Sequence, residues 1–301
     1  EEYCANFYPV KDINQLVHPV PKPVAPFEQK KAVESFRQRF PSGPQVGDEY
    51  SDTLKDDSNG PTMVVLPLGS FHMGSNYGEY DEQPVHRVTI DTPLSMMKYE
   101  VTFDDWNKCV AAKRCDSNRH EHYGADEGWG RGNRPIINVT FANAKNYALW
   151  LSEETGKHYR LPSEAEWEFA ARGGTTLIFP WSDTLNQAHV HAPKCCNITS
   201  NIKDQWVNTA PVGSFKANDF GLHDLYGNVQ EFVSDCYHKN YQGAPIHGEP
   251  WMGCNNRNHG LYRVVRGGHF RLSKNKLGSA ARGNTNGHPN DQTGFRLVQE
   301  L

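Results

Sequence analysis

Residues 221–232 read GLHDLYGNVQEF, and this stretch is typical of the C-terminal half of the chain. Short apolar runs alternate in it with glycine and asparagine, which favour turns. The chain beyond it also consists of loops and short strands, and it ends in the strand-like GFRLV of residues 294–298. Few regular elements and many turns predict an irregular, loop-rich α+β domain with little regular secondary structure.

Three helices are expected upstream of this stretch, each with a hydroxyl side chain before its first turn. Thr102, Thr140 and Ser163 are the predicted N-caps, and Asp105 and Glu166 stand where a capping box needs an acid. Short strands are expected at residues 63–66, 70–73 and 86–91. Most of the regular structure therefore precedes the loop-rich half of the chain.

The composition excludes several classes of protein. The chain has 301 residues and a net charge of −4, which argues against a nucleic-acid binder that depends on phosphate neutralisation. Its 37% hydrophobic and 11% aromatic residues are enough for a packed core, which excludes a highly charged disordered chain. No apolar run approaches the ~20 residues that a membrane-spanning helix needs, so no membrane span is expected.

The first 61 residues differ from the rest, so two units are expected: an N-terminal arm over residues 1–61 and a main domain over residues 62–301. The arm contains a Pro-rich spacer at residues 19–26, typical of polyproline II, and a short predicted helix at residues 27–40. Residues 41–61 are rich in Ser, Gly, Pro and Asp, which predicts a loop or linker. The arm either packs on the main domain or serves as a lipid or protein tether.

Seven cysteines bear on the cellular compartment. The short spacing of Cys109 and Cys115 is typical of a local disulfide, and Cys236 with Cys254 could close a second loop. The alternative is a cytosolic protein with seven free, partly buried thiols. Disulfides are favoured because several of these cysteines stand in polar loops, and they imply an extracytoplasmic protein that is periplasmic, secreted or membrane-tethered. The odd number leaves one thiol over, for which Cys4 is the candidate.

An ordered set of motifs resembles the formylglycine-generating enzyme, or sulfatase-modifying factor, family. The matching segments are LPLGSFHMG (66–74), EQPVH (82–86), YEVT (99–102), RPIINVT (134–140), YRLPSEAEWE (159–168), FPW (179–181), GLHDLYGNVQEF (221–232), RGG (266–268) and GFR (294–296). They occur in family order, and the ordered set is far more specific than any one segment. The resemblance implies the family fold, an irregular relative of the C-type lectin architecture, but not by itself an activity.

The resemblance also locates the positions at which family oxidases carry two copper-binding cysteines. These lie just after the Gly-Gly pair, five residues apart, and here they are Leu272 and Leu277. A leucine has no thiolate to bind copper or to exchange disulfides. Formylglycine generation by the family mechanism is therefore not expected.

Other branches of the family keep the fold without those cysteines, and they leave several functions open. Some members are binding or scaffold proteins, which is our first hypothesis, with a protein partner or small ligand at a degenerate pocket formed by His269, Leu272 and Leu277. The second is an oxidoreductase of a cysteine-independent branch, related to non-haem-iron or pyoverdine-maturation enzymes, with His269 and Arg271 as candidate catalytic residues. A surface role for His269 is the alternative. A lectin-like carbohydrate binder is a third class.

A calcium site is implied by the resemblance. The family site maps to Asp224, Gly227, Val229 and Glu231, whose two carboxylates and two backbone carbonyls suit a hard cation. The alternative is that Glu231 and Asn228 only hydrogen-bond the turn. Iron or copper is not expected under the first hypothesis.

A second family calcium site maps to a less suitable set of residues, namely His189, Val190, Asp204 and Trp206. His189 stands there in place of an asparagine oxygen donor, and imidazole is a poor calcium ligand, which argues against this second site.

Overall fold

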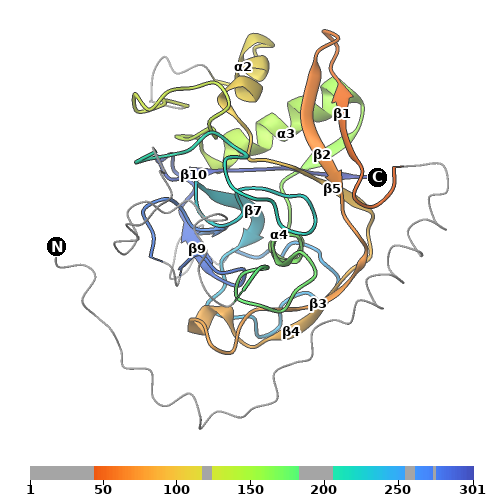
Figure 1. The fold of residues 1–301 in the computed structure, drawn as a ribbon, viewed down its shortest axis with the longest axis vertical. Coiled ribbons are helices and arrows are strands. Elements are labelled where there is room, and N and C mark those ends of the chain that lie inside the picture. Colours follow the sequence, from red (N-terminus) through yellow and green to blue (C-terminus); the bar gives the residue numbers. More distant parts are fainter. Residues whose placement is uncertain (1–43, 117–123, 183–205, 255–261, 274–275) are drawn as a thin grey trace.

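The computed structural model describes residues 44–116, 124–182, 206–254, 262–273 and 276–301, and it has the loop-rich α+β character expected from the sequence (Figure 1). The Pro-rich spacer and the helix expected at residues 27–40 lie outside the described residues. In the described part of the chain, no helix is both long enough and apolar enough to cross a membrane.

The described strands form two larger sheets and one pair. The first sheet is antiparallel, in the order β1 (Glu49–Thr53), β2 (Asn59–Val65), β5 (Leu94–Met97), β11 (Val298–Glu300) and β6 (His158–Arg160). The second has the order β10 (Thr293–Gly294), β7 (Gln230–Cys236), β8 (Arg263–Arg266) and β9 (Arg282–Thr285), with β10 parallel to β7. The strands β3 (Gly69–Met73) and β4 (His86–Ile90) pair with each other.

The three helices expected from the sequence are confirmed, and the structure adds the 3₁₀ turn η2 (Tyr80–Glu82). They are α2 (Phe103–Ala111), α3 (Phe141–Thr155) and α4 (Glu164–Arg172). Each begins with a reciprocal capping box, in which the N-cap hydroxyl accepts the N–H three residues on. A hydroxyl followed three residues later by an acid or amide is a local signal, so it can be recognised without knowledge of the fold.

The loop predicted at residues 41–61 is wrong, because this segment contains β1 and the start of β2. Glu49 pairs with Val64 and Tyr50 with Met63, which makes β1 an edge strand of the first sheet. All five residues of β1 are at least partly accessible to solvent. An edge strand tolerates polar side chains on its open side, so its composition resembles that of a loop.

Helix α4 lies in the interior of the fold. All nine of its residues are buried, and it contacts β3, β4, β7 and β8. Figure 1 shows α4 between the β3–β4 pair and the end of the molecule that carries α2 and α3. Trp167, fully buried on α4, lies in a core cluster that includes Leu225, Tyr226 and Leu277.

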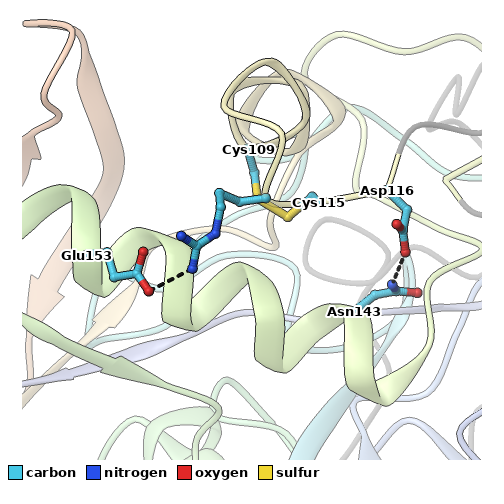
Figure 2. The surroundings of a disulfide bond; sticks show 6 residues. Cys109, Cys115, Asp116, Asn143 and Glu153 are labelled. Carbon is cyan, nitrogen blue, oxygen red and sulfur yellow. Dashed lines mark hydrogen bonds and ion pairs between the residues drawn. A yellow bond between two sulfur atoms is a disulfide. The ribbon is translucent and has the colours of Figure 1, made fainter.

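Both expected disulfides are present, Cys109–Cys115 and Cys236–Cys254. The first joins the end of α2 to the turn that follows it, and Figure 2 shows this turn lying over α3. There Arg114 pairs with Glu153 and the amide of Asn143 donates to Asp116. Structural disulfides persist in oxidising compartments, so the two bonds indicate such an environment. Cys4, Cys195 and Cys196 lie outside the described residues.

Candidate functional site

The two leucines at the cysteine positions of the family lie against the glycine pair after β8. Leu277 is fully buried in the core cluster around Trp167, and Leu272 is partly buried against that cluster. A Cβ atom added to Gly268 would lie 2.6 Å from Leu277 Cδ2 and 3.4 Å from Leu272 Cδ1. The two side chains therefore converge on the backbone of Gly268 and form a packed apolar contact.

His269 follows this glycine pair and begins a turn, in which the N–H of Leu272 donates to His269 O at 2.9 Å. The side chain is only 7% exposed, so the interpretation of His269 as a surface histidine is wrong. Its Nδ1 accepts the N–H of Arg271 at 3.3 Å, which leaves the ring hydrogen of the neutral form on Nε2. Burial, and then the charge of Arg271, lower the pKa of His269 to about 4, so the ring is neutral near pH 7.

Arg271 has a partner that sequence reasoning did not find. Its Nη2 donates to Asp291 Oδ2 at 2.7 Å, and its guanidinium lies over the rings of Phe270, at 4.9 Å, and Trp129, at 5.9 Å. Trp129 meets Phe270 edge-on. Neither Trp129 nor Asp291 could be assigned to this site from sequence, because both lie outside the motif that contains His269. The turn of residues 269–272, with Trp129 and Asp291, is called the turn site below.

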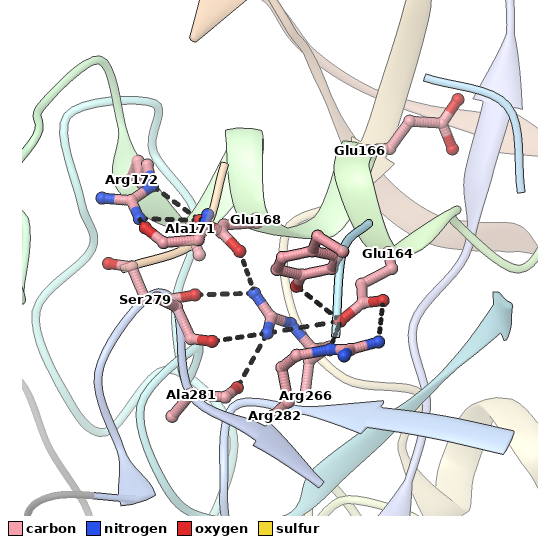
Figure 3. Close-up of polar contacts among 12 residues, drawn as sticks. Glu164, Glu166, Glu168, Ala171, Arg172, Arg266, Ser279, Ala281 and Arg282 are labelled. Carbon is pink, nitrogen blue, oxygen red and sulfur yellow. Dashed lines mark hydrogen bonds and ion pairs between the residues drawn. The ribbon is translucent and has the colours of Figure 1, made fainter. Parts of the chain in front are cut away.

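A second polar group lies beneath α4 and consists of buried ion pairs (Figure 3). Glu164 accepts two N–H groups of Arg282, at 2.6 and 2.9 Å. Glu168 pairs with Arg266 at 2.5 Å and with Arg172 at 2.7 Å. Arg266 also donates to three backbone carbonyls, those of Ser279, Ala280 and Ala281. These five side chains, the α4 ion-pair cluster, fasten α4 to β8 and β9, and they have the form of a structural network.

The residues expected to bind calcium lie in a third buried group, around Arg296. Arg296 donates to both oxygens of Glu231, at 2.8 to 2.9 Å, and Trp167 Nε1 donates to Glu231 Oε2 at 2.8 Å. Asp224 Oδ2 accepts the N–H of Gly213 at 2.6 Å. Glu100 accepts from the side chain of Asn228 at 2.8 Å. Three buried carboxylates therefore surround one guanidinium.

This surplus of negative charge is costly in the core. Burial, and then the charges of Asp224 and Glu231, raise the pKa of Glu100 well above its usual range, while Arg296 acts in the opposite direction. A divalent cation would offset the surplus, since hard cations prefer oxygen ligands and favour ionised carboxylates. The charge balance of the group therefore fits calcium.

The backbone of the turn also fits an oxygen-lined site. Asp224 and Asn228 have left-handed φ values of 60° and 59°, in which Asp and Asn are among the few residues tolerated, and Gly227 has φ 108°. Three N–H groups make four hydrogen bonds to the Glu231 carboxylate, because Arg296 Nε contacts both of its oxygens, so a metal at Glu231 would share oxygens that already accept hydrogen bonds. Among the described residues, no three His, Cys, Asp or Glu side chains converge as a metal centre, but the expected set needs only two.

The second family calcium site falls mostly outside the part of the chain that the structure describes. His189, Val190 and Asp204 of the second family calcium site lie outside the described residues, and Trp206 is the first described residue after that gap. The turn site and the group around Arg296 are adjacent in the fold, since the N–H of Phe270 donates to Asn228 O at 3.0 Å.

The sequence profile that matches the chain is described as a sulfatase-modifying factor enzyme 1-like domain, and it covers residues 50–301. The formylglycine-generating enzyme of Mycobacterium tuberculosis is 35% identical over 236 residues, which cover 61% of this chain and 77% of that enzyme. The serine/threonine-protein kinase pkn1 of Chlamydia caviae is 30% identical over 287 residues, which cover 89% of this chain. The matched part is only 43% of the length of that relative.

Solved structures agree with these matches. PvdO from Pseudomonas aeruginosa superposes with a TM-score of 0.72 and is 32% identical, and the match covers 86% of this chain and 100% of PvdO. The Treponema denticola variable protein 1 has a TM-score of 0.64 at 22% identity and shares the fold.

Proposed function

The chain belongs to the sulfatase-modifying factor enzyme 1-like family, and we propose that it is a non-catalytic member that binds a protein partner or a small ligand at the turn site. The observation that carries this proposal is the packing of Leu272 and Leu277 on Gly268. Copper-dependent oxidation by family members needs two thiolates at these positions, and a leucine pair can neither bind copper nor form a disulfide with a substrate. Leu277 is buried at one of these positions, so oxygen could reach it only if the leucine moved, and the core would then lose packing.

Oxygen consumption tests this proposal. The chain is incubated with copper and a peptide that contains a substrate cysteine, and dissolved oxygen is followed against a sample without protein. The formylglycine-generating enzyme of Mycobacterium tuberculosis, assayed in parallel, shows that the conditions support turnover. We expect no oxygen consumption above background from this chain. Copper-dependent turnover by the wild-type chain would contradict the proposal.

Calcium is proposed as a structural ion held by Asp224, Gly227, Val229 and Glu231. The positive charge of a bound calcium ion would offset the surplus negative charge of the carboxylates around Arg296, which supports the assignment. The midpoint of thermal unfolding is expected to fall when calcium is removed with a chelator and to recover when calcium, but not magnesium, is added back. Asp224→Asn should reduce this dependence. An unchanged midpoint after complete removal would show that Arg296 alone balances the carboxylates.

An extracytoplasmic location, periplasmic, secreted or membrane-tethered, is proposed as well, and two disulfides support it. Protein alkylated directly on cell lysis, without reductant, should retain both bonds by mass spectrometry. If Cys109, Cys115, Cys236 and Cys254 are all alkylated, the location is reducing and this part of the proposal fails.

A second candidate function is that of an oxidoreductase of a cysteine-independent branch that acts on a small molecule or peptide. His269 and Arg271 would then be its reactive groups, because they lie together at the turn site. A stoichiometric iron or copper content, with turnover that is lost in His269→Ala, would support this candidate. If that variant retains both turnover and ligand binding, the candidate loses its only named histidine.

A further inference from the structure

The turn site offers a ligand mainly hydrogen-bond donors. Arg271 Nη1 and Nη2 face Asp291, at 3.4 and 2.7 Å, and Arg271 Nε meets no acceptor among the described residues. His269 Nδ1 accepts a backbone N–H, so its Nε2 carries the remaining hydrogen. Two different nitrogen donors, one on a guanidinium and one on a neutral imidazole, therefore belong to the same turn.

The guanidinium is held in place before any ligand arrives. It lies over the buried ring of Phe270 and beside Trp129, and Asp291 holds its far edge. Gln292 also donates to Asp291 Oδ1 at 3.1 Å, which steadies the carboxylate. An arginine fixed by stacking and by a carboxylate loses less side-chain entropy when it binds a further group.

The charges of the site favour a planar, singly charged ligand. Asp291 already balances Arg271, so this carboxylate would repel a dianion such as phosphate more strongly than a single charge, and the described residues of the turn site hold no further cation to compensate. The side edge of a guanidinium, formed by Nε and one Nη, matches the two oxygens of a carboxylate. Leu272 is partly buried beside this edge, and Trp129 adds an aromatic ring, so the surroundings suit an apolar group.

We infer that the turn site binds a carboxylate that carries an apolar or aromatic group, with Arg271 and His269 as its donors. This inference rests on the proposed function, because it names the ligand class for the binding activity assigned there. Two sources share this chemistry: a small organic acid and the C-terminal carboxylate of a peptide that ends in an aromatic residue.

Calorimetry on the full chain tests the inference with defined probes. Benzoate and the dipeptide acetyl-alanyl-phenylalanine supply the two sources, while benzamide and the C-terminal amide of the dipeptide lack the negative charge. Inorganic phosphate at the same ionic strength is the dianion control. We expect at least one of the two acids to bind at least tenfold more tightly than its neutral amide and than phosphate. The tighter of the two acids identifies the source.

Variants then assign the binding to the turn site. Arg271→Gln and Arg271→Lys should each weaken carboxylate binding about tenfold, because lysine keeps the charge but lacks the planar fork. Arg114→Gln, at the exposed pair with Glu153, is the matched control and should bind like the wild type. The thermal midpoint of each variant shows whether it is folded, and the half-exposed position of Arg271 makes folding failure unexpected.

Three results would overturn the inference: no binding of either acid, phosphate binding as tight as that of the acids, or full affinity in Arg271→Lys. These results are separable from a failure of the proposed function. A chain that neither oxidises thiol peptides nor binds carboxylates would remain a non-catalytic member and would need a different ligand. A chain that oxidises thiol peptides would contradict the proposed function whatever it binds.

Discussion

The α4 ion-pair cluster and the turn site both adjoin the C-terminal end of β8, yet they differ in almost every physical respect. Beneath α4, acids and guanidinium groups are buried and paired, with the two acids Glu164 and Glu168 facing the three arginines Arg266, Arg282 and Arg172. At the turn site, the buried groups are a neutral histidine and Phe270, Leu272 is partly buried, and the ion pair between Arg271 and Asp291 is partly exposed.

The comparison separates what the family fold requires from what its chemistry requires. A buried charge that loses its partner strongly destabilises the protein, so the acids and arginines beneath α4 must be kept or lost together. The cysteine positions of the family carry no such constraint, because leucines can fill the space once the chemistry is abandoned. The motifs that identify the family are therefore mostly structural, and they cannot by themselves report activity.

The largest effect is expected from breaking the α4 ion-pair cluster. Arg266→Met leaves the buried Glu168 with Arg172 as its remaining partner. It also removes the donor to three buried backbone carbonyls, those of Ser279, Ala280 and Ala281. The free energy of unfolding should fall by about 3–5 kcal/mol, as measured by denaturant titration. Arg114→Met, which breaks the exposed pair with Glu153, should cost less than about 1 kcal/mol. Equal losses in the two variants would show that the cluster does not hold the fold.

A somewhat smaller effect is expected at the leucine pair. Leu277→Ala leaves a cavity beside Gly268 and should lower the free energy of unfolding by about 3 kcal/mol. Leu149→Ala is the control, since Leu149 is 57% exposed on α3 and its removal should change stability little. A loss below about 1 kcal/mol for Leu277→Ala would mean that the leucines are not packed as described.

His269 should make the free energy of unfolding depend on pH in a defined direction. Its folded pKa of about 4 lies below its value in the unfolded chain, so between these values the unfolded chain alone binds a proton. The free energy of unfolding should therefore decrease as pH falls from 7 to 5, by about 2 kcal/mol relative to His269→Asn. Unfolding curves of both proteins at each pH measure this difference. A constant difference would show that the ring is not buried in its neutral form.

The smallest effect is expected at the ion pair of the turn site. Asp291→Asn removes the charge that faces Arg271, but both side chains are partly exposed to water. The loss of stability should be less than about 1 kcal/mol, whereas carboxylate binding at the turn site should change measurably. Denaturant titration and calorimetry on the same variant test both statements. A loss of several kcal/mol would place this pair with the structural cluster beneath α4.

Much of the fold could be predicted from the sequence because its signals are local. The three capping boxes and the αL glycine that ends α3 at Gly156 depend on residues a few positions apart. The two disulfides were also recognisable, since each joins cysteines that are close in sequence. The edge strand β1 was missed because its polar residues face solvent and resemble a loop.

The candidate site was only partly predictable. His269, Leu272 and Leu277 follow one motif, so sequence reasoning could place them together. The partners of Arg271 and Arg282 could not be named, because Asp291 and Glu164 reach them only through the folded chain. Long-range pairs of this kind depend on how strands and loops pack, and residue spacing does not encode that.

The metal content of protein purified without chelators or a histidine tag tests the central claim most directly. A member that has exchanged thiol and copper chemistry for ligand binding, and kept a structural calcium, should contain about one calcium per chain and no iron or copper. Elemental analysis by mass spectrometry measures all three at once. Stoichiometric iron or copper would contradict the account and place the cysteine-independent oxidoreductase first.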